Sequence, residues 1–180
     1  MIYKIDNFLK YSDWKNISAN LLGTRFSWYY NSHKVKNNDG QFQFTHLFWS
    51  REEGKNSDYY ELVNPIIDKL NPDVIARVKA NLTTKTENIK DSTMHRDLNN
   101  YSENQWTGIY YVNTNNGVTK FETGDVCESV ANRFVCFKSD LKHAGTTHTD
   151  ENVRCVINFN WFGFIDTDNK VNIISKLYED

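Results

Sequence analysis

Hydrophobic and polar residues follow a helical pattern near the start of the chain. In residues 6–22, apolar side chains recur at helical spacing among polar ones, which predicts an amphipathic helix. Asp6 or Asn7 is the expected N-cap, and Gly23 is the expected stop. A second helix is predicted over residues 60–70, and the proline inside that stretch must begin or kink it.

After residue 72 the pattern changes to short runs rich in β-branched and aromatic residues. Turn signals separate these runs, among them Asn115-Asn116-Gly117 and Thr123-Gly124-Asp125. The predicted strands are residues 74–82, 106–113, 118–122, 126–130, 133–137 and 153–164. Many short strands at this spacing favour a mainly β, α+β fold, an antiparallel sandwich or barrel with the N-terminal helices packed on the outside.

Length and charge narrow the class of protein. A chain of 180 residues with 39% hydrophobic residues and no internal repeat or linker predicts one domain, residues 1–180. The formal net charge is -2, and basic and acidic residues are mixed along the chain, so nucleic acid is not the expected partner. No apolar run is long enough for a signal peptide or a membrane span. We therefore expect a cytoplasmic protein.

The three cysteines, Cys127, Cys136 and Cys155, lie far apart inside apolar alternating segments. None belongs to a C-x-x-C pair, so metal binding and disulfide pairing are not expected. Buried, reduced thiols agree with the cytoplasmic setting.

The segment His95-Arg96-Asp97-Leu98 has two possible interpretations. As a kinase catalytic loop it would require an asparagine at position 102, where Ser102 stands, together with a glycine-rich loop and a D-F-G motif. None of these occurs in the sequence. The remaining interpretation is that His95 and Asp97 are metal ligands.

On a strand, side chains two residues apart point to the same face, so His95 and Asp97 would project together. His143, expected to begin an Ala-Gly turn after strand 133–137, can complete a set of two histidines and one carboxylate. This set leaves one face of an octahedral ion open and is typical of non-haem Fe(II) oxygenases. A second H-x-D pair, His148 and Asp150, lies in a polar stretch and has no later histidine to complete a set.

Arg154 opens a strand with strict alternation. The pattern predicts Arg154, Val156, Asn158 and Asn160 on one face, and the intervening residues on the other. An arginine on an otherwise packed strand favours a carboxylate partner, either that of a ligand or one of the chain's own acids.

Six segments together resemble the 2-oxoglutarate- and Fe(II)-dependent oxygenases, in particular the prolyl-hydroxylase-like branch and its compact members from tailed phages. The resemblance runs from about residue 74 to residue 162. The segments are His95-x-Asp97, TGIYYVN at 107–113, GVTKF at 117–121, NRFVCF at 132–137, His143-Ala144-Gly145, and Arg154 ahead of INF at 157–159.

The resemblance implies a double-stranded β-helix, or distorted jelly roll, with Fe(II) held by His95, Asp97 and His143. It also implies that Arg154 binds the distal carboxylate of the co-substrate 2-oxoglutarate. Tyr111 stands where the prolyl hydroxylases supply a phenol to that carboxylate, and Asn81 is a further candidate for a co-substrate contact. The implied activity is a hydroxylation that consumes O2 and 2-oxoglutarate.

Three functions remain open at the level of sequence. The first is hydroxylation of a protein or peptide side chain, with proline as the leading candidate, and the second is the same chemistry on a small metabolite or nucleobase. The third is a binding module that has lost catalysis. AlkB-type nucleic-acid demethylases carry a second arginine where this chain has Asn160, which argues against a nucleobase. No motif identifies the primary substrate, the role of the aromatic N-terminal half or the oligomeric state.

Overall fold

A computed structural model describes residues 1–35, 40–98 and 103–163. Its N-terminal half contains β1 (Ile2–Ile5), α1 (Tyr11–Leu21), β2 (Tyr29–Asn31), β3 (Gln43–Ser50), β4 (Gly54–Lys55), η1 (Tyr60–Val63) and α2 (Asn64–Leu70). Its C-terminal half contains β5 (Val74–Thr84), β6 (Gln105–Tyr111), β7 (Asn115–Phe121), β8 (Val126–Ser129), β9 (Arg133–Lys138), β10 (His143–Gly145) and β11 (Val153–Phe162). Most of the described chain outside the two helices is therefore in antiparallel strands or the turns between them.

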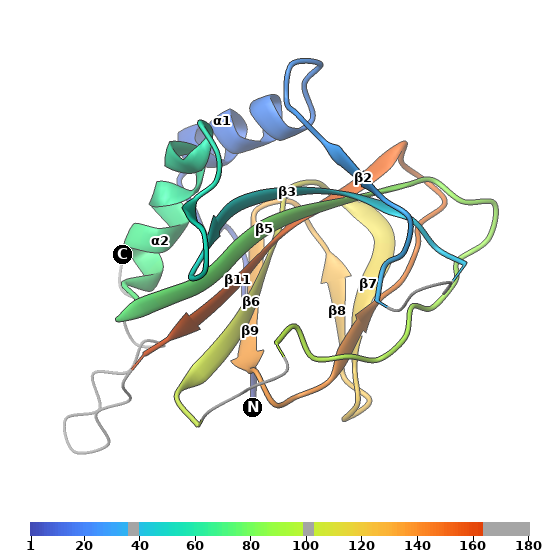
Figure 1. The fold of residues 1–180 in the computed structure, drawn as a ribbon. Coiled ribbons are helices and arrows are strands. Elements are labelled where there is room, and N and C mark those ends of the chain that lie inside the picture. Colours follow the sequence, from blue (N-terminus) through green and yellow to red (C-terminus); the bar gives the residue numbers. More distant parts are fainter. Residues whose placement is uncertain (36–39, 99–102, 164–180) are drawn as a thin grey trace.

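The strands form two sheets that face one another. The large sheet has the order β1-β9-β6-β11-β5-β3-β2, with β4 added to β3, and the small sheet has the order β10-β7-β8. Figure 1 shows β7 and β8 on one side of the large sheet and both helices, α1 and α2, on the other side. The last strand, β11, lies in the middle of the large sheet, between β6 and β5.

The alternation along β11 has the two faces that the sequence predicts. Cys155, Ile157 and Phe159 are buried in the main core, which also contains Ile17 and Leu21 of α1 and residues of α2. The other face of β11 looks toward the small sheet and carries the polar residues. Helices thus cover one face of the large sheet, and the opposite face remains available to form a pocket between the sheets.

The first helix is shorter than predicted. Residues 6–10 are not helical, because Asn7 has a φ of 51° and the N–H groups of Phe8 and Leu9 bond to the backbone and side-chain oxygens of Asn132. The N-cap of α1 is Lys10, which makes no side-chain cap bond, so the prediction of Asp6 or Asn7 as N-cap was wrong. The stop at Gly23 is confirmed, because α1 ends at Leu21. Glycine suits this position, since a Cβ there would lie 2.6 Å from the Ala19 carbonyl oxygen.

The second helical prediction is confirmed with a subdivision. The stretch from Tyr60 contains the 3-10 turn η1, and α2 follows it with Pro65 in its first turn. A proline is tolerated there because the N–H groups of the first turn have no partner within a helix. None of the described helices is long and apolar enough to cross a membrane.

One turn prediction was wrong, and the strands of the N-terminal half were missed. Asn115-Asn116-Gly117 is not a turn but the start of β7, where the pairing with β8 shifts between Asn115 and Val118. The Asn115 side chain accepts a hydrogen bond from the Gly117 N–H, a local bond that turns also use. In the N-terminal half, β1, β2, β3 and β4 were not predicted at all.

Candidate metal centre and its pocket

His95, Asp97 and His143 come together at the open end of the space between the sheets. His143 begins β10, and His95 forms an isolated bridge with it through two backbone hydrogen bonds of 3.0 Å. The sequence placed His95 and Asp97 on a regular strand and His143 in a turn. The structure corrects both expectations, because the bridge to β10 rather than a continuous strand positions the His95 segment.

The three side chains have the geometry of a metal site. Their ligand atoms all lie within 4.8 Å of one another, and no other such group occurs in the described part of the chain. His95 Nε2 and His143 Nε2 are each 3.7 Å from Asp97 Oδ1. Metal–ligand bonds of about 2.0–2.2 Å place neighbouring ligand atoms roughly 3–3.5 Å apart, so small side-chain movements would let all three reach one ion.

The protonation states also suit a cation. His95 Nδ1 lies 3.0 Å from the Thr93 carbonyl oxygen, a contact in which the ring N–H donates, so Nε2 is the ring nitrogen that faces Asp97. Burial lowers the pKa of His143 despite the opposing effect of Asp97, and this favours the neutral imidazole that metals bind. The residues present therefore fit a divalent metal such as iron.

The second oxygen of Asp97 is held from the large sheet. Asn158 and Asn160 of β11 donate to Oδ2 at 3.4 and 3.2 Å, and Arg77 of β5 lies 3.5 Å from it. Burial alone would raise the pKa of Asp97, but its interactions with His95, His143 and Arg77 hold it well below its ordinary value. Asp97 is therefore an ionised carboxylate whose second oxygen is held by hydrogen bonds from the large sheet.

An inner pocket leads from this site to Arg154. Arg154 is buried on β11, and it donates to Ser129 Oγ at 3.0 Å and to Thr119 Oγ1 at 3.3 Å. No acidic side chain pairs with it within the described residues, so an intramolecular salt bridge is not observed there. Burial lowers the pKa of Arg154, and a buried cation of this kind is stabilised by an anion.

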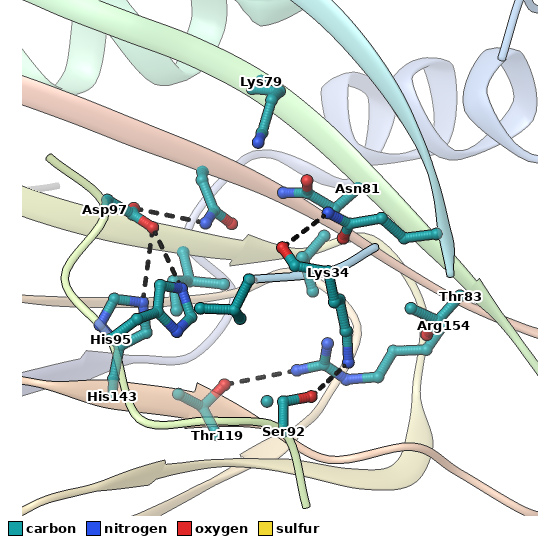
Figure 2. Close-up of a pocket in the computed structure, with 16 residues that line it drawn as sticks. Lys34, Lys79, Asn81, Thr83, Ser92, His95, Asp97, Thr119, His143 and Arg154 are labelled. Atoms are coloured by element: carbon teal, nitrogen blue, oxygen red, sulfur yellow. Dashed lines mark hydrogen bonds and ion pairs between the residues drawn. The ribbon is translucent and has the colours of Figure 1, made fainter. Parts of the chain in front are cut away.

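The walls of the inner pocket carry further polar groups. Asn81 and Thr83 of β5 and Thr119 of β7 line it, and Figure 2 shows Arg154 bonded to Thr119 on the side away from Asp97. Thr83 Oγ1 is buried without a hydrogen-bond partner among the described residues. Tyr111 lies behind this wall, where its hydroxyl donates to Thr119 Oγ1 at 2.8 Å. The co-substrate contacts of Tyr111 and Asn81 stay predictions, and Thr83 and Thr119 were missed by the sequence reasoning.

An outer hollow adjoins the inner pocket at the metal centre, and the two share Lys34, Val35, Lys79, His95 and Asp97. Lys79 belongs to both hollows, and Figure 2 shows it apart from Arg154, on the other side of Asn81. The residues that line the outer hollow are Lys34, Val35, Arg77, Lys79, His95, Arg96, Asp97, Leu98 and Lys142. Alternation along β5 brings Arg77, Lys79, Asn81 and Thr83 to one face. Because Asn81 was already a candidate for the site, the same alternation in the sequence could have identified Lys79 and Thr83 as its neighbours.

The other histidines have no place in this centre. His148 is fully buried, and its segment does not form a metal group with Asp150, whose carboxylate accepts from the Asn116 N–H. His46 is a hydrogen-bonded core residue, with Nδ1 2.7 Å from the Ser27 carbonyl and Nε2 2.7 Å from Ser57 Oγ. The three cysteines are free and buried, as predicted.

No protein-family profile and no curated protein matches the sequence. Solved structures do match the fold. A 2OG-Fe(II) oxygenase-family oxidoreductase from Burkholderia pseudomallei matches with a TM-score of 0.65 and 12% identity, over 89% of this chain and 84% of that one. A prolyl hydroxylase from Trichoplax adhaerens, in complex with a hypoxia-inducible-factor peptide, matches with a TM-score of 0.56 and 14% identity over 89% and 83% of the two chains.

A third structure, a non-haem alpha-ketoglutarate-dependent carbocyclase of nogalamycin biosynthesis, matches with a TM-score of 0.60 and 11% identity over 90% of this chain and 79% of that one. The fold of the chain is therefore the double-stranded β-helix of the 2-oxoglutarate oxygenases, as the sequence predicts.

Proposed function

We propose that the chain is a 2-oxoglutarate- and Fe(II)-dependent oxygenase of the prolyl-hydroxylase-like branch, in its compact phage-type form, acting as a single domain. One observation carries this proposal. A group of two histidines and one carboxylate lies at one end of a pocket, and a buried arginine with no acidic partner among the described residues lies in the same pocket. An acid that binds a metal at one end and carries a carboxylate at the other, as 2-oxoglutarate does, fits both features.

The site residues have separate roles in this proposal. His95, Asp97 and His143 would hold Fe(II), which with O2 supplies the oxidative decarboxylation of 2-oxoglutarate and the oxygen atom for hydroxylation. Arg154 binds the distal carboxylate, and the hydroxyls of Thr119 and Thr83 contribute to the same end of the pocket.

The proposed substrate is a side chain of a protein or peptide, with proline as the leading candidate. The likeness in fold to a prolyl hydroxylase complexed with a peptide supports this choice. Small acids form the second candidate class, supported by the basic outer hollow beside the metal centre. Mass spectrometry of cellular proteins and metabolites, with and without the active enzyme, would identify the substrate by a gain of one oxygen atom.

The enzyme hypothesis is tested with protein purified without oxygen and then supplied with Fe(II), 2-oxoglutarate and O2. We expect succinate to form, and we expect calorimetry to show 2-oxoglutarate binding only after metal has been added. His143→Ala should abolish metal binding, whereas His148→Ala should retain it, with circular dichroism verifying that both variants are folded.

Absence of succinate together with absence of metal-dependent 2-oxoglutarate binding would show that the chain is a binding module without this chemistry. Loss of metal binding in a folded His148→Ala variant, with retention in His143→Ala, would overturn the choice of ligands.

A further inference from the structure

The outer hollow is much more basic than the chain as a whole. Although the formal net charge is -2, five of the nine residues that line this hollow are lysine or arginine, and four of them remain when Lys34, whose ammonium group bonds to Ser92 of the inner pocket, is left out. Asp97 is its one acidic residue among the described residues, and the metal-ligand histidines and two asparagines already surround that carboxylate. The hollow therefore presents a net positive charge next to the proposed reaction centre, and a local field of this kind attracts anions.

Lys79 is the residue of the outer hollow on which the inference depends. It lies on β5 between Arg77 and Asn81, on the face that looks into the pocket, and it lines both hollows. No hydrogen bond or ion pair links its ammonium group to another described residue. Burial and the neighbouring charge of Arg77 lower the pKa of Lys79 to about 8, and the opposing effect of Asp97 does not restore it. An ammonium group held here without a partner weakens the folded state unless an anion joins it.

The co-substrate does not account for Lys79. The proposed partner of the distal carboxylate is Arg154, which lies with Thr119 in the part of the inner pocket away from Lys79. The outer hollow contains neither Arg154 nor Thr119, but it includes two metal ligands, His95 and Asp97. A molecule in the outer hollow can thus contact Lys79 and the metal centre without contacting Arg154.

We propose that the outer hollow binds an anionic group of the primary substrate, a carboxylate or a phosphate, and that Lys79 is the cation that contacts it closest to the metal centre. This inference rests on the proposed function, because it takes the outer hollow as the place of the substrate. It narrows the substrate class to molecules with a negative charge a few bonds from the carbon that is hydroxylated. Such a charge is present in a small acid and in a peptide with an acidic residue beside the modified one.

The test uses the full chain loaded with Mn(II) and saturating 2-oxoglutarate in the absence of oxygen, so that no turnover occurs and the Arg154 end is filled. Calorimetry then measures the binding of four probes: inorganic phosphate, acetate, N-acetyl-Asp-Pro-amide and N-acetyl-Asn-Pro-amide. The two dipeptides differ only in the charge beside the proline. We expect Asp-Pro to bind at least 10-fold more tightly than Asn-Pro.

Lys79→Met keeps the length of the side chain and removes its charge. We expect it to weaken the binding of the anionic probes at least 10-fold and to leave metal and 2-oxoglutarate binding unchanged. Lys85→Met, an exposed position just beyond β5, is the matched control and should leave all probe binding unchanged. Tighter binding of phosphate and acetate than of Asp-Pro would identify a small acid as the source of the anion, and the reverse order would identify an acidic peptide.

Equal binding of the Asp-Pro and Asn-Pro probes to the unaltered protein, with no bound phosphate or acetate, would overturn the proposal. Anion binding that 2-oxoglutarate displaces, and that Lys79→Met does not change, would also overturn it, because the anion would then occupy the Arg154 site. The same titrations are repeated without metal and 2-oxoglutarate. If the anionic probes bind in these titrations and Lys79→Met weakens that binding, the anion site exists. If the same protein forms no succinate, the oxygenase function is rejected while the anion site is retained.

Discussion

Asp97 uses its two carboxylate oxygens for different partners. One oxygen faces the imidazoles of His95 and His143, and the other receives the amides of Asn158 and Asn160. Outer partners of this type orient a metal ligand and keep it ionised. Asn160 is the more connected of the two amides, because its Nδ2 also donates to Thr107 and its Oδ1 accepts from Arg77.

The variant Asn160→Asp tests this support. It replaces a donor 3.2 Å from Asp97 with a second carboxylate of the same shape. Repulsion should raise the pKa of Asp97 and draw Arg77 away from it, so metal affinity should fall by roughly 10- to 100-fold. Metal titration followed by calorimetry measures the change. Asn16→Asp, at an exposed position of α1, is the control, and equal metal affinity in the two variants would contradict the role given to Asn160.

Gly117 sets the position of the Arg154 side chain. A Cβ at this residue would lie 3.0 Å from Arg154 Cδ and 2.9 Å from Asn115 Oδ1. Gly117→Ala should therefore displace the guanidinium and weaken 2-oxoglutarate binding about 10-fold, while metal binding alone stays normal. Gly124→Ala is the control for general strain, because its φ of 91° disfavours alanine although the space around it is open. Unchanged 2-oxoglutarate binding in Gly117→Ala would contradict the argument.

At the scale of residues, sequence reasoning named side chains whose chemistry is distinctive. His95, Asp97, His143 and Arg154 stand out because few residue types bind metals or carboxylates. Thr83, Thr119 and Lys79 are common residue types, and they gain a role only when β5 and β7 bring them to the pocket. No local pattern distinguishes such a lysine from one on a solvated surface.

The Asn132 side chain helps to hold the segment between β1 and α1 against the large sheet. Asn132, with a φ of 61°, donates to the Leu9 carbonyl, and its Oδ1 accepts from the Leu9 N–H and the Tyr110 hydroxyl. These bonds are buried and lie beside the pairing of β1 with β9. The packing of the segment before α1 therefore depends on this residue.

Asn132→Gly removes the side chain but keeps the backbone conformation accessible. The loss of three buried hydrogen bonds should lower the free energy of unfolding by about 2–4 kcal/mol. Urea denaturation followed by circular dichroism measures this. Asn71→Gly, at the left-handed C-cap of α2 with a φ of 45°, is the matched control and should change stability by less than about 0.5 kcal/mol. Similar losses in both variants would show that only the backbone conformation matters.

At the scale of elements, the sequence predicts strands best where alternation is sustained. The strand predicted at 153–164 is observed as β11, Val153–Phe162, with the two faces that were predicted, and residue 164 lies outside the described residues. The strands of the N-terminal half were missed because β1, β2 and β4 are only two to four residues long and because aromatic residues occupy both faces of β3. The start of α1 was missed because a residue more than 120 positions away bonds to the segment before it.

The whole molecule depends on contacts between distant parts of the chain at its candidate site. His95 and His143 are joined by an isolated backbone bridge and by contact between their rings, and Asp97 is held by β5 and β11. A metal ion bound by all three side chains would fasten the His95 segment to both sheets. Folding and metal binding would then be coupled.

Added metal should stabilise the folded protein by mass action. At a free metal concentration 100 times the dissociation constant, the gain is about 2.7 kcal/mol, and 2-oxoglutarate should add to it. Thermal unfolding with and without Mn(II) measures the shift in Tm. Asp97→Asn should lose the shift, whereas Asp91→Asn, at an exposed carboxylate bonded to Lys120, should keep it. A shift that persists in Asp97→Asn would place the metal elsewhere.

The central place of β11 in the large sheet has a consequence for how the protein is made. The strands on both sides of it, β5 and β6, are synthesised first but have no common neighbour until β11 is present. On the ribosome, the large sheet cannot close before Phe162 has left the exit tunnel. Because such long-range pairings form slowly, we expect the chain to complete its fold, and to acquire its metal, only after translation has passed this strand.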